Sequence, residues 1–156
     1  MPVYLIRHAH AGSRSGWEGD DDHRPLSPKG RYQTDGLVTW LRDESIDEVR
    51  SSPSIRCVET VEPLADGHGL TVVVDRSLHE GSDVDECIAA VLAASGQTLV
   101  LCSHGDLIPK VIRRLVAKGM RTNSPNLSQK GSAWVLEIVD GVPVSAVYQP
   151  PFAKST

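Results

Sequence analysis

Near the N-terminus, the stretch Val3-Tyr4-Leu5-Ile6-Arg7-His8-Ala9 joins an apolar run to a polar pair. Four consecutive apolar residues are expected of a strand that is buried on both faces of a sheet, and a polar pair follows where that strand ends. Thr98 to Cys102 is another apolar run, and it ends in Ser103-His104-Gly105. Because ligands of open α/β sheets bind beyond the carboxyl ends of the strands, Arg7, His8 and His104 are expected to face one pocket.

Helical and extended patterns alternate along the rest of the chain. Helices are expected from Ser27-Pro28 to about Asp43, from Ser52-Pro53 onward with a break or kink at Pro63, over Val84 to Ala94, and over Asp106 to Lys118. Further strands are expected at Glu48 to Ser51, Leu70 to Val74, Ala133 to Val139 and Val144 to Tyr148, the last two joined by the turn dipeptide Asp140-Gly141. This order predicts a three-layer α/β/α fold with a mostly parallel central sheet that ends in an antiparallel pair.

Length and composition fit one folded domain. The chain has 156 residues, of which 40% are hydrophobic and 23% are charged, so a hydrophobic core can form. We assign residues 1–149 to this domain and expect 150–156 to be a frayed C-terminal tail. The net charge of -4 argues against sequence-independent binding to nucleic acid or to a membrane surface. With no signal peptide or membrane-spanning run, we expect a cytoplasmic protein.

Three cysteines, Cys57, Cys87 and Cys102, do not match a known catalytic or metal-binding spacing. None of them has an arginine six residues later, which a cysteine-dependent phosphatase would require. Buried packing is their expected role.

A phosphate pocket is the simplest use of Arg7, His8, Arg56 and His104 if the fold brings them together. Guanidinium groups bind the nonbridging oxygens of a phosphoryl group in a bidentate manner, and a neutral imidazole offers a lone pair to phosphorus. Arg56 is predicted in the first turn of a helix, where free amide groups also favour an anion. This chemistry requires neither a metal nor a cofactor.

These residues stand in motifs that resemble the histidine phosphatase superfamily, also called phosphoglycerate-mutase-like. The matching segments are Leu5-Ile6-Arg7-His8-Ala9, Ser51-Ser52-Pro53-Ser54-Ile55-Arg56 and Ser103-His104-Gly105. The resemblance implies a phosphoglycerate-mutase-like fold and a phosphatase that forms a phosphohistidine intermediate on His8. Within the family the short chain looks most like SixA-type phosphohistidine phosphatases and the histidine phosphatase domain attached to some Nudix hydrolases.

The resemblance also implies roles for individual residues. His8 would attack the phosphoryl group of a small phosphomonoester or of a phosphohistidine protein, while Arg7, Arg56 and His104 would hold it. His8 must be neutral for this, so its other ring nitrogen is expected to donate to a backbone carbonyl, for example in the Ala11-Gly12 turn. Glu80 is our choice for the acid that protonates the leaving group, because it stands where the main branch of the family carries its acid.

Several alternatives stay open. Asp106 is a rival for the general acid, and its other reading is a helix N-cap. His8 and His10 could instead be ligands of a metal-dependent hydrolase. The chain could also be a phosphate-binding regulatory domain with little catalysis. The sequence does not indicate the physiological substrate, the oligomeric state or the pathway.

Other polar residues are expected around the pocket or at the surface. Arg14 is expected to border the pocket, whereas the acidic run that includes Asp21 and Asp22 is expected to be solvated. His79 shows no partner pattern and is assigned to the surface, and Lys130 belongs to a later polar stretch.

Overall fold

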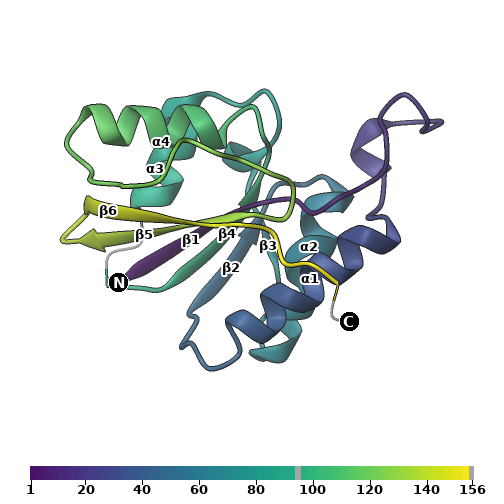
Figure 1. The fold of residues 1–156 in the computed structure, drawn as a ribbon, viewed down its shortest axis with the longest axis horizontal. Coiled ribbons are helices and arrows are strands. Elements are labelled where there is room, and N and C mark those ends of the chain that lie inside the picture. Colours follow the sequence, from purple (N-terminus) through teal and green to yellow (C-terminus); the bar gives the residue numbers. More distant parts are fainter. Residues whose placement is uncertain (94–95, 155–156) are drawn as a thin grey trace.

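Six strands form one sheet in the computed structural model, which describes residues 1–93 and 96–154. The strand order is β3-β2-β4-β1-β5-β6 (Figure 1). The strands are β1 (Pro2–Arg7), β2 (Glu48–Ser51), β3 (Val73–Val74), β4 (Leu99–Ser103), β5 (Ala133–Val139) and β6 (Val142–Gln149). β1, β2, β3 and β4 run parallel, while β5 pairs antiparallel with both β1 and β6. The predicted sheet, mostly parallel and ended by an antiparallel pair, is confirmed.

Helices cover both faces of the sheet and make the predicted three layers. They are α1 (Pro28–Trp40), α2 (Ile55–Gly67), α3 (Val84–Leu92) and α4 (Ile108–Ala117), with short 3-10 turns at Asp21–His23 and Arg76–Leu78. Helices α1 and α2 lie on one face, and α3 and α4 lie on the other (Figure 1). None of the helices in the described residues is long and apolar enough to cross a membrane.

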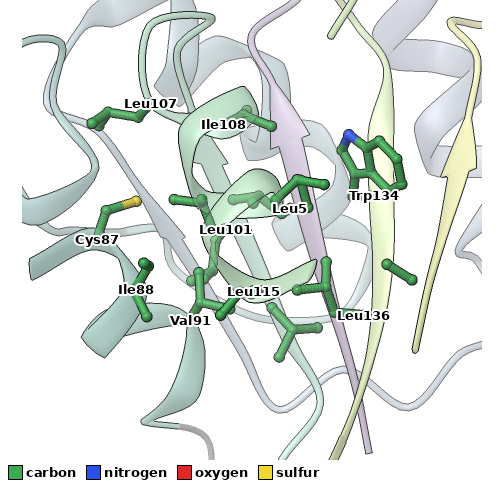
Figure 2. Close-up of a cluster of buried hydrophobic side chains, with 14 of the residues drawn as sticks. Leu5, Cys87, Ile88, Val91, Leu101, Leu107, Ile108, Leu115, Trp134 and Leu136 are labelled. Carbon is green, nitrogen blue, oxygen red and sulfur yellow. The ribbon is translucent and has the colours of Figure 1, made fainter. Parts of the chain in front are cut away.

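The apolar run of β1 supplies both cores, because successive side chains of a strand point to opposite faces. Val3 and Leu5 pack with α3 and α4, and Figure 2 shows Leu5 beside Leu101 in this cluster. Tyr4 and Ile6 pack into the other core, with α1 and α2. Full burial of a side chain of this size contributes roughly 1.5–3 kcal/mol to the free energy of unfolding. The buried side chains of β1 therefore hold its carboxyl end in place.

Helix α2 differs from the sequence prediction at its start and at Pro63. It begins at Ile55 after the N-cap Ser54, rather than at the Ser52-Pro53 signature. It also continues through Pro63 to Gly67 without ending there. A proline inside a helix removes one backbone hydrogen bond, but the neighbouring Val61 and Leu64 are fully buried, and this packing keeps the helix continuous.

Other boundaries shift by a few residues. Helix α1 ends at Trp40, β3 is reduced to Val73–Val74, and α4 begins at Ile108. Ala94, the predicted end of α3, lies outside the described residues. The hairpin prediction is confirmed, because Asp140 (φ 51°) and Gly141 (φ 76°) both adopt the left-handed conformation of a two-residue turn.

The expectation of a frayed tail is wrong for residues 150–154, which pack on α1. The Phe152 ring lies 5.7 Å from the Trp40 ring between centroids. Gly36 makes room for it, since a Cβ atom at position 36 would collide with the Cβ of Phe152. Lys154 Nζ lies 4.7 Å from the centroid of the Tyr32 ring. The last two residues of the predicted tail, 155–156, lie outside the described residues.

Candidate active site

One pocket of about 330 Å³ is lined by Arg7, His8, Arg56, Glu80 and His104. Strand β1 ends at Arg7, directly before His8, and β4 ends directly before His104. Registry between the two strands pairs Arg7 with Ser103, so the two histidines emerge at neighbouring positions. The structure therefore brings all five predicted residues to the carboxyl edge of the sheet.

His8 is held as a neutral imidazole. It is only 5% exposed, and its Nδ1 lies 2.8 Å from the carbonyl oxygen of Ala9. A carbonyl only accepts, so Nδ1 carries the proton and Nε2 carries the lone pair. The prediction of a carbonyl partner in the Ala11-Gly12 turn is wrong, because the carbonyl of the adjacent residue Ala9 is already within reach of Nδ1. Burial, reinforced by the charges of His104, Arg56 and Arg7, lowers the pKa of His8 to about 3.

Arg7 is positioned by the loop before β5 and by the glycine after His104. Its Nη1 donates to the carbonyl oxygen of Ser128 over 2.6 Å. A Cβ atom at Gly105 would lie 2.5 Å from Cζ of Arg7. The guanidinium therefore fills the space that any side chain at position 105 would need. Burial lowers the pKa of Arg7.

Arg56 is completely buried, so its charge requires close partners. Nη1 donates to the carbonyl oxygen of Asp21 over 2.8 Å, and Nη2 lies 3.1 Å from Asp21 Oδ2. Nη2 also lies 3.3 Å from Glu80 Oε2. Two carboxylates and one carbonyl therefore fix the orientation of this guanidinium at the start of α2.

His104 is buried beside His8, with 5.4 Å between the ring centroids. Its Nε2 lies 2.8 Å from Ser52 Oγ and 3.5 Å from Cys57 Sγ. The sequence pattern of Ser52 predicts a cap for α2. In the structure its hydroxyl contacts His104 instead. All three cysteines are buried as expected, but the contact of Cys57 with His104 has no signature in the sequence.

Glu80 and Asp106, the two candidate acids, have different surroundings. Glu80 bridges two arginines, with Oε1 2.7 Å from Arg14 Nη2 and Oε2 facing Arg56. Asp106 Oδ2 accepts a hydrogen bond from the backbone amide of Gly81 over 2.8 Å. Asp106 is not the N-cap of α4, because Leu107 occupies that position.

Asp21 and Asp22, at the end of the acidic run after His8, turn inward, which contradicts the expectation that they are solvated, whereas Glu18 and Asp20 of the same run are exposed as expected. Asp21 pairs with Arg14, Arg24 and Arg56. Burial alone raises the pKa of Asp21, but the hydrogen bond from Arg24 and the charges of Arg56 and Arg14 bring it below its ordinary value. The acidic side chains here neutralise an arginine cluster.

Three further residues of this region have no signal in the sequence. Arg24 is buried and donates from Nη1 to the carbonyl oxygen of Ala11 over 2.6 Å. His79 is expected at the surface, but its Nε2 lies 3.0 Å from Asp22 Oδ1. The His79 ring also lies 6.1 Å from the His104 ring, measured between centroids.

Lys130 lines the pocket. Arg14 borders it, as expected.

His10 lies apart from His8 in the structure. Its Nδ1 is 2.6 Å from Ser27 Oγ, and the ring lines a different hollow. Within the described ranges, no group of three or more His, Cys, Asp or Glu side chains could hold a metal ion. The geometry does not support the alternative in which these two histidines share a metal.

Fold and site together define an α/β protein with a histidine and arginine pocket suited to phosphoryl transfer. The sequence profile of the histidine phosphatase superfamily (branch 1) matches residues 3–86. The chain belongs to this superfamily, as its motifs predict.

Known relatives agree with this assignment. An 8-oxo-(d)GTP phosphatase of Mycolicibacterium smegmatis is 32% identical over 160 residues, which cover 96% of this chain and 48% of the relative. The chain thus spans about half the length of that relative.

Solved structures show the same fold. The protein histidine phosphatase SixA in complex with tungstate matches with a TM-score of 0.78 and 20% identity, covering 98% of this chain and 97% of SixA. The alpha-ribazole phosphatase of Shigella flexneri matches with a TM-score of 0.71 and 18% identity, covering 100% and 99%. The predicted SixA-like, phosphoglycerate-mutase-like fold is confirmed.

Proposed function

We propose that the protein hydrolyses a small phosphomonoester or phosphohistidine through a phosphohistidine intermediate on His8. One observation carries this proposal: a buried, neutral His8, whose Nε2 bears the lone pair, shares a pocket with Arg7, Arg56 and His104. An imidazole in this state is a nucleophile at neutral pH without a base to activate it. The surrounding cations suit the charge of the phosphoryl oxygens in the transition state.

The reaction has two steps. Nε2 of His8 attacks phosphorus, the bond to the leaving group breaks, and the leaving oxygen takes a proton from an acid-base residue. Water then attacks the phosphoryl group on His8 and loses a proton to the same residue. The bond between phosphorus and Nε2 breaks, which releases inorganic phosphate and a neutral imidazole. Arg7 and Arg56 hold the nonbridging oxygens throughout. Their Nε groups are buried and have no partner in the described part of the chain, which fits side chains whose remaining donors serve an anion.

Glu80 is our choice for the acid-base residue in both steps. It lines the same pocket as His8, and its side chain is 36% exposed, so it can exchange a proton with solvent after each turnover. Asp106 holds the amide of Gly81, and this contact favours a positioning role for Asp106 next to Glu80. A positioned acid typically contributes about 10² to 10⁴ in rate.

The leaving group is better supported as an alcohol than as an imidazole. An alkoxide needs a proton as it departs, whereas phosphohistidine loses its imidazole with less help. The presence of a carboxyl group at the pocket therefore favours a phosphomonoester. The 32% identical relative, named an 8-oxo-(d)GTP phosphatase, supports nucleotides as one class to include in a substrate screen.

Turnover of para-nitrophenyl phosphate tests the proposal. We expect hydrolysis in the presence of a chelator and its loss in His8→Ala. His23→Ala removes an exposed imidazole from the loop after β1 and is the matched control, which should keep full activity. Binding of phosphate without hydrolysis of any ester would favour a regulatory domain. Activity that needs added zinc or manganese would favour the metal-dependent alternative.

A further inference from the structure

A second hollow adjoins the catalytic pocket, because Lys130 lines both. We call it the basic hollow and define it by its polar lining residues, which are His10, Lys29, Gln33, Gln129 and Lys130. Its volume is about 500 Å³, and residues 150–153 form its apolar wall. It is therefore large enough for a group bigger than a single phosphate.

The charge of the basic hollow is uncompensated. No carboxylate lines it, and the ion pairs found among residues 1–93 and 96–154 include neither Lys29 nor Lys130. Burial, followed by the charges of Arg7, Arg24, Arg56 and Lys29, lowers the pKa of Lys130. Two lysines thus line one hollow that no carboxylate faces, in a protein whose net charge is -4. A concave site with charges of one sign attracts an anion.

The two sides of the basic hollow are fixed by a buried side chain. Gln33 accepts a hydrogen bond from the backbone amide of His10 over 2.8 Å and donates to the carbonyl oxygen of Lys130 over 3.1 Å. Gly131, with φ +83°, makes room for it, since a Cβ atom there would lie 2.8 Å from Gln33 Cδ. The amide of Gly131 also donates to the carbonyl oxygen of His8 over 3.0 Å. The residue that follows Lys130 is thus hydrogen-bonded to the backbone of His8.

We infer that the basic hollow binds a second phosphoryl group of the substrate, carried by the leaving group. The inference rests on the proposed function, which places the transferred phosphoryl on the His8 side of Lys130. Lys130 contacts the group next to it, and Lys29 contacts the more distant charge. The substrate class is then a small molecule with two or more phosphoryl groups, instead of a simple monoester or a phosphohistidine peptide.

Competition against para-nitrophenyl phosphate tests this inference with defined probes. The inhibition constants of inorganic phosphate and tripolyphosphate are measured for the wild type and for Lys29→Gln at one ionic strength. Lys118→Gln removes an exposed lysine beside another hollow and controls for net charge. We expect tripolyphosphate to bind the wild type more tightly than phosphate. The inhibition constant of phosphate divided by that of tripolyphosphate should fall roughly fivefold in Lys29→Gln, which is the upper range for an exposed ion pair. This ratio should not change in Lys118→Gln.

Equal inhibition by the two probes in the wild type would overturn the inference, as would an unchanged ratio in Lys29→Gln. Calorimetric titration gives the same ratio without turnover. A protein that binds tripolyphosphate through Lys29 but hydrolyses no ester would contradict the proposed function and still support the basic hollow. A protein that hydrolyses para-nitrophenyl phosphate but shows no preference for tripolyphosphate would support the proposed function and contradict the inference about the basic hollow.

Discussion

Burial of His8 in its neutral form makes the free energy of unfolding depend on pH. The pKa of His8 is about 3 in the folded protein and about 6.5 in an unfolded chain. Between these values the unfolded state binds more protons than the folded state, so stability falls as the pH is lowered below about 6.5. At about pH 5, roughly 1.5 units below the unfolded value, the loss amounts to about 2 kcal/mol.

Chemical denaturation of the wild type, His8→Gln and His23→Gln at about pH 7 and about pH 5 measures this loss. We expect the free energy of unfolding of the wild type to fall by about 2 kcal/mol more than that of His8→Gln. His23 is exposed, so His23→Gln should follow the wild type. Carboxylates with a lowered pKa, such as Asp21, lose their contribution only at a more acidic pH, as the pH falls through their folded values. They do not obscure this comparison.

An identical pH dependence in the wild type and His8→Gln would contradict a neutral, buried His8. It would mean that His8 accepts a proton in the folded protein as readily as in the unfolded chain. The lone pair on Nε2 would then be lost in mildly acidic solution, and His8 would not be a nucleophile kept ready by burial.

Three further predictions concern the residues of the pocket and its independence of metal ions. Glu80→Gln should slow alkyl phosphates by about 10² or more but aryl phosphates much less, because an aryl oxide leaves without a proton; equal slowing in a kcat comparison would exclude Glu80 as the acid. Gly105→Ala should raise KM for para-nitrophenyl phosphate roughly tenfold by displacing Arg7, whose Cζ lies 2.5 Å from the added Cβ. Gly67→Ala meets nothing within 4 Å and should leave KM unchanged; equal KM values in the two variants would contradict the role of Gly105. Dialysis against a chelator should leave kcat unchanged, and a loss restored by zinc or manganese would contradict the phosphohistidine mechanism.

The sheet and the convergence of the two histidines could be predicted because strands buried on both faces appear as uninterrupted apolar runs. Val3 to Ile6 and Thr98 to Cys102 are such runs, and polar residues begin where each ends. The carboxyl ends of neighbouring parallel strands meet at one edge, so position in the sequence was enough to place Arg7, His8 and His104 in one pocket.

Contacts between distant segments could not be predicted. Ser52-Pro53 has the local pattern of a helix cap, but the hydroxyl of Ser52 lies against His104, more than fifty residues later. The acidic run around Asp21 has the local pattern of a solvated segment, but the carboxylate of Asp21 pairs with the buried Arg56. Phe152 packs on Trp40, although the end of a chain usually frays. In each case the contact is made with a residue of another element, and the local sequence does not predict that contact.

The central claim is that a covalent bond forms between phosphorus and Nε2 of His8. Rapid acid-free quenching during turnover of para-nitrophenyl phosphate, followed by peptide mass spectrometry, locates the phosphoryl group. We expect one phosphoryl group on the peptide that contains His8, labile in acid and absent from His8→Ala. A phosphoryl group on another residue, or full turnover by His8→Ala, would contradict it.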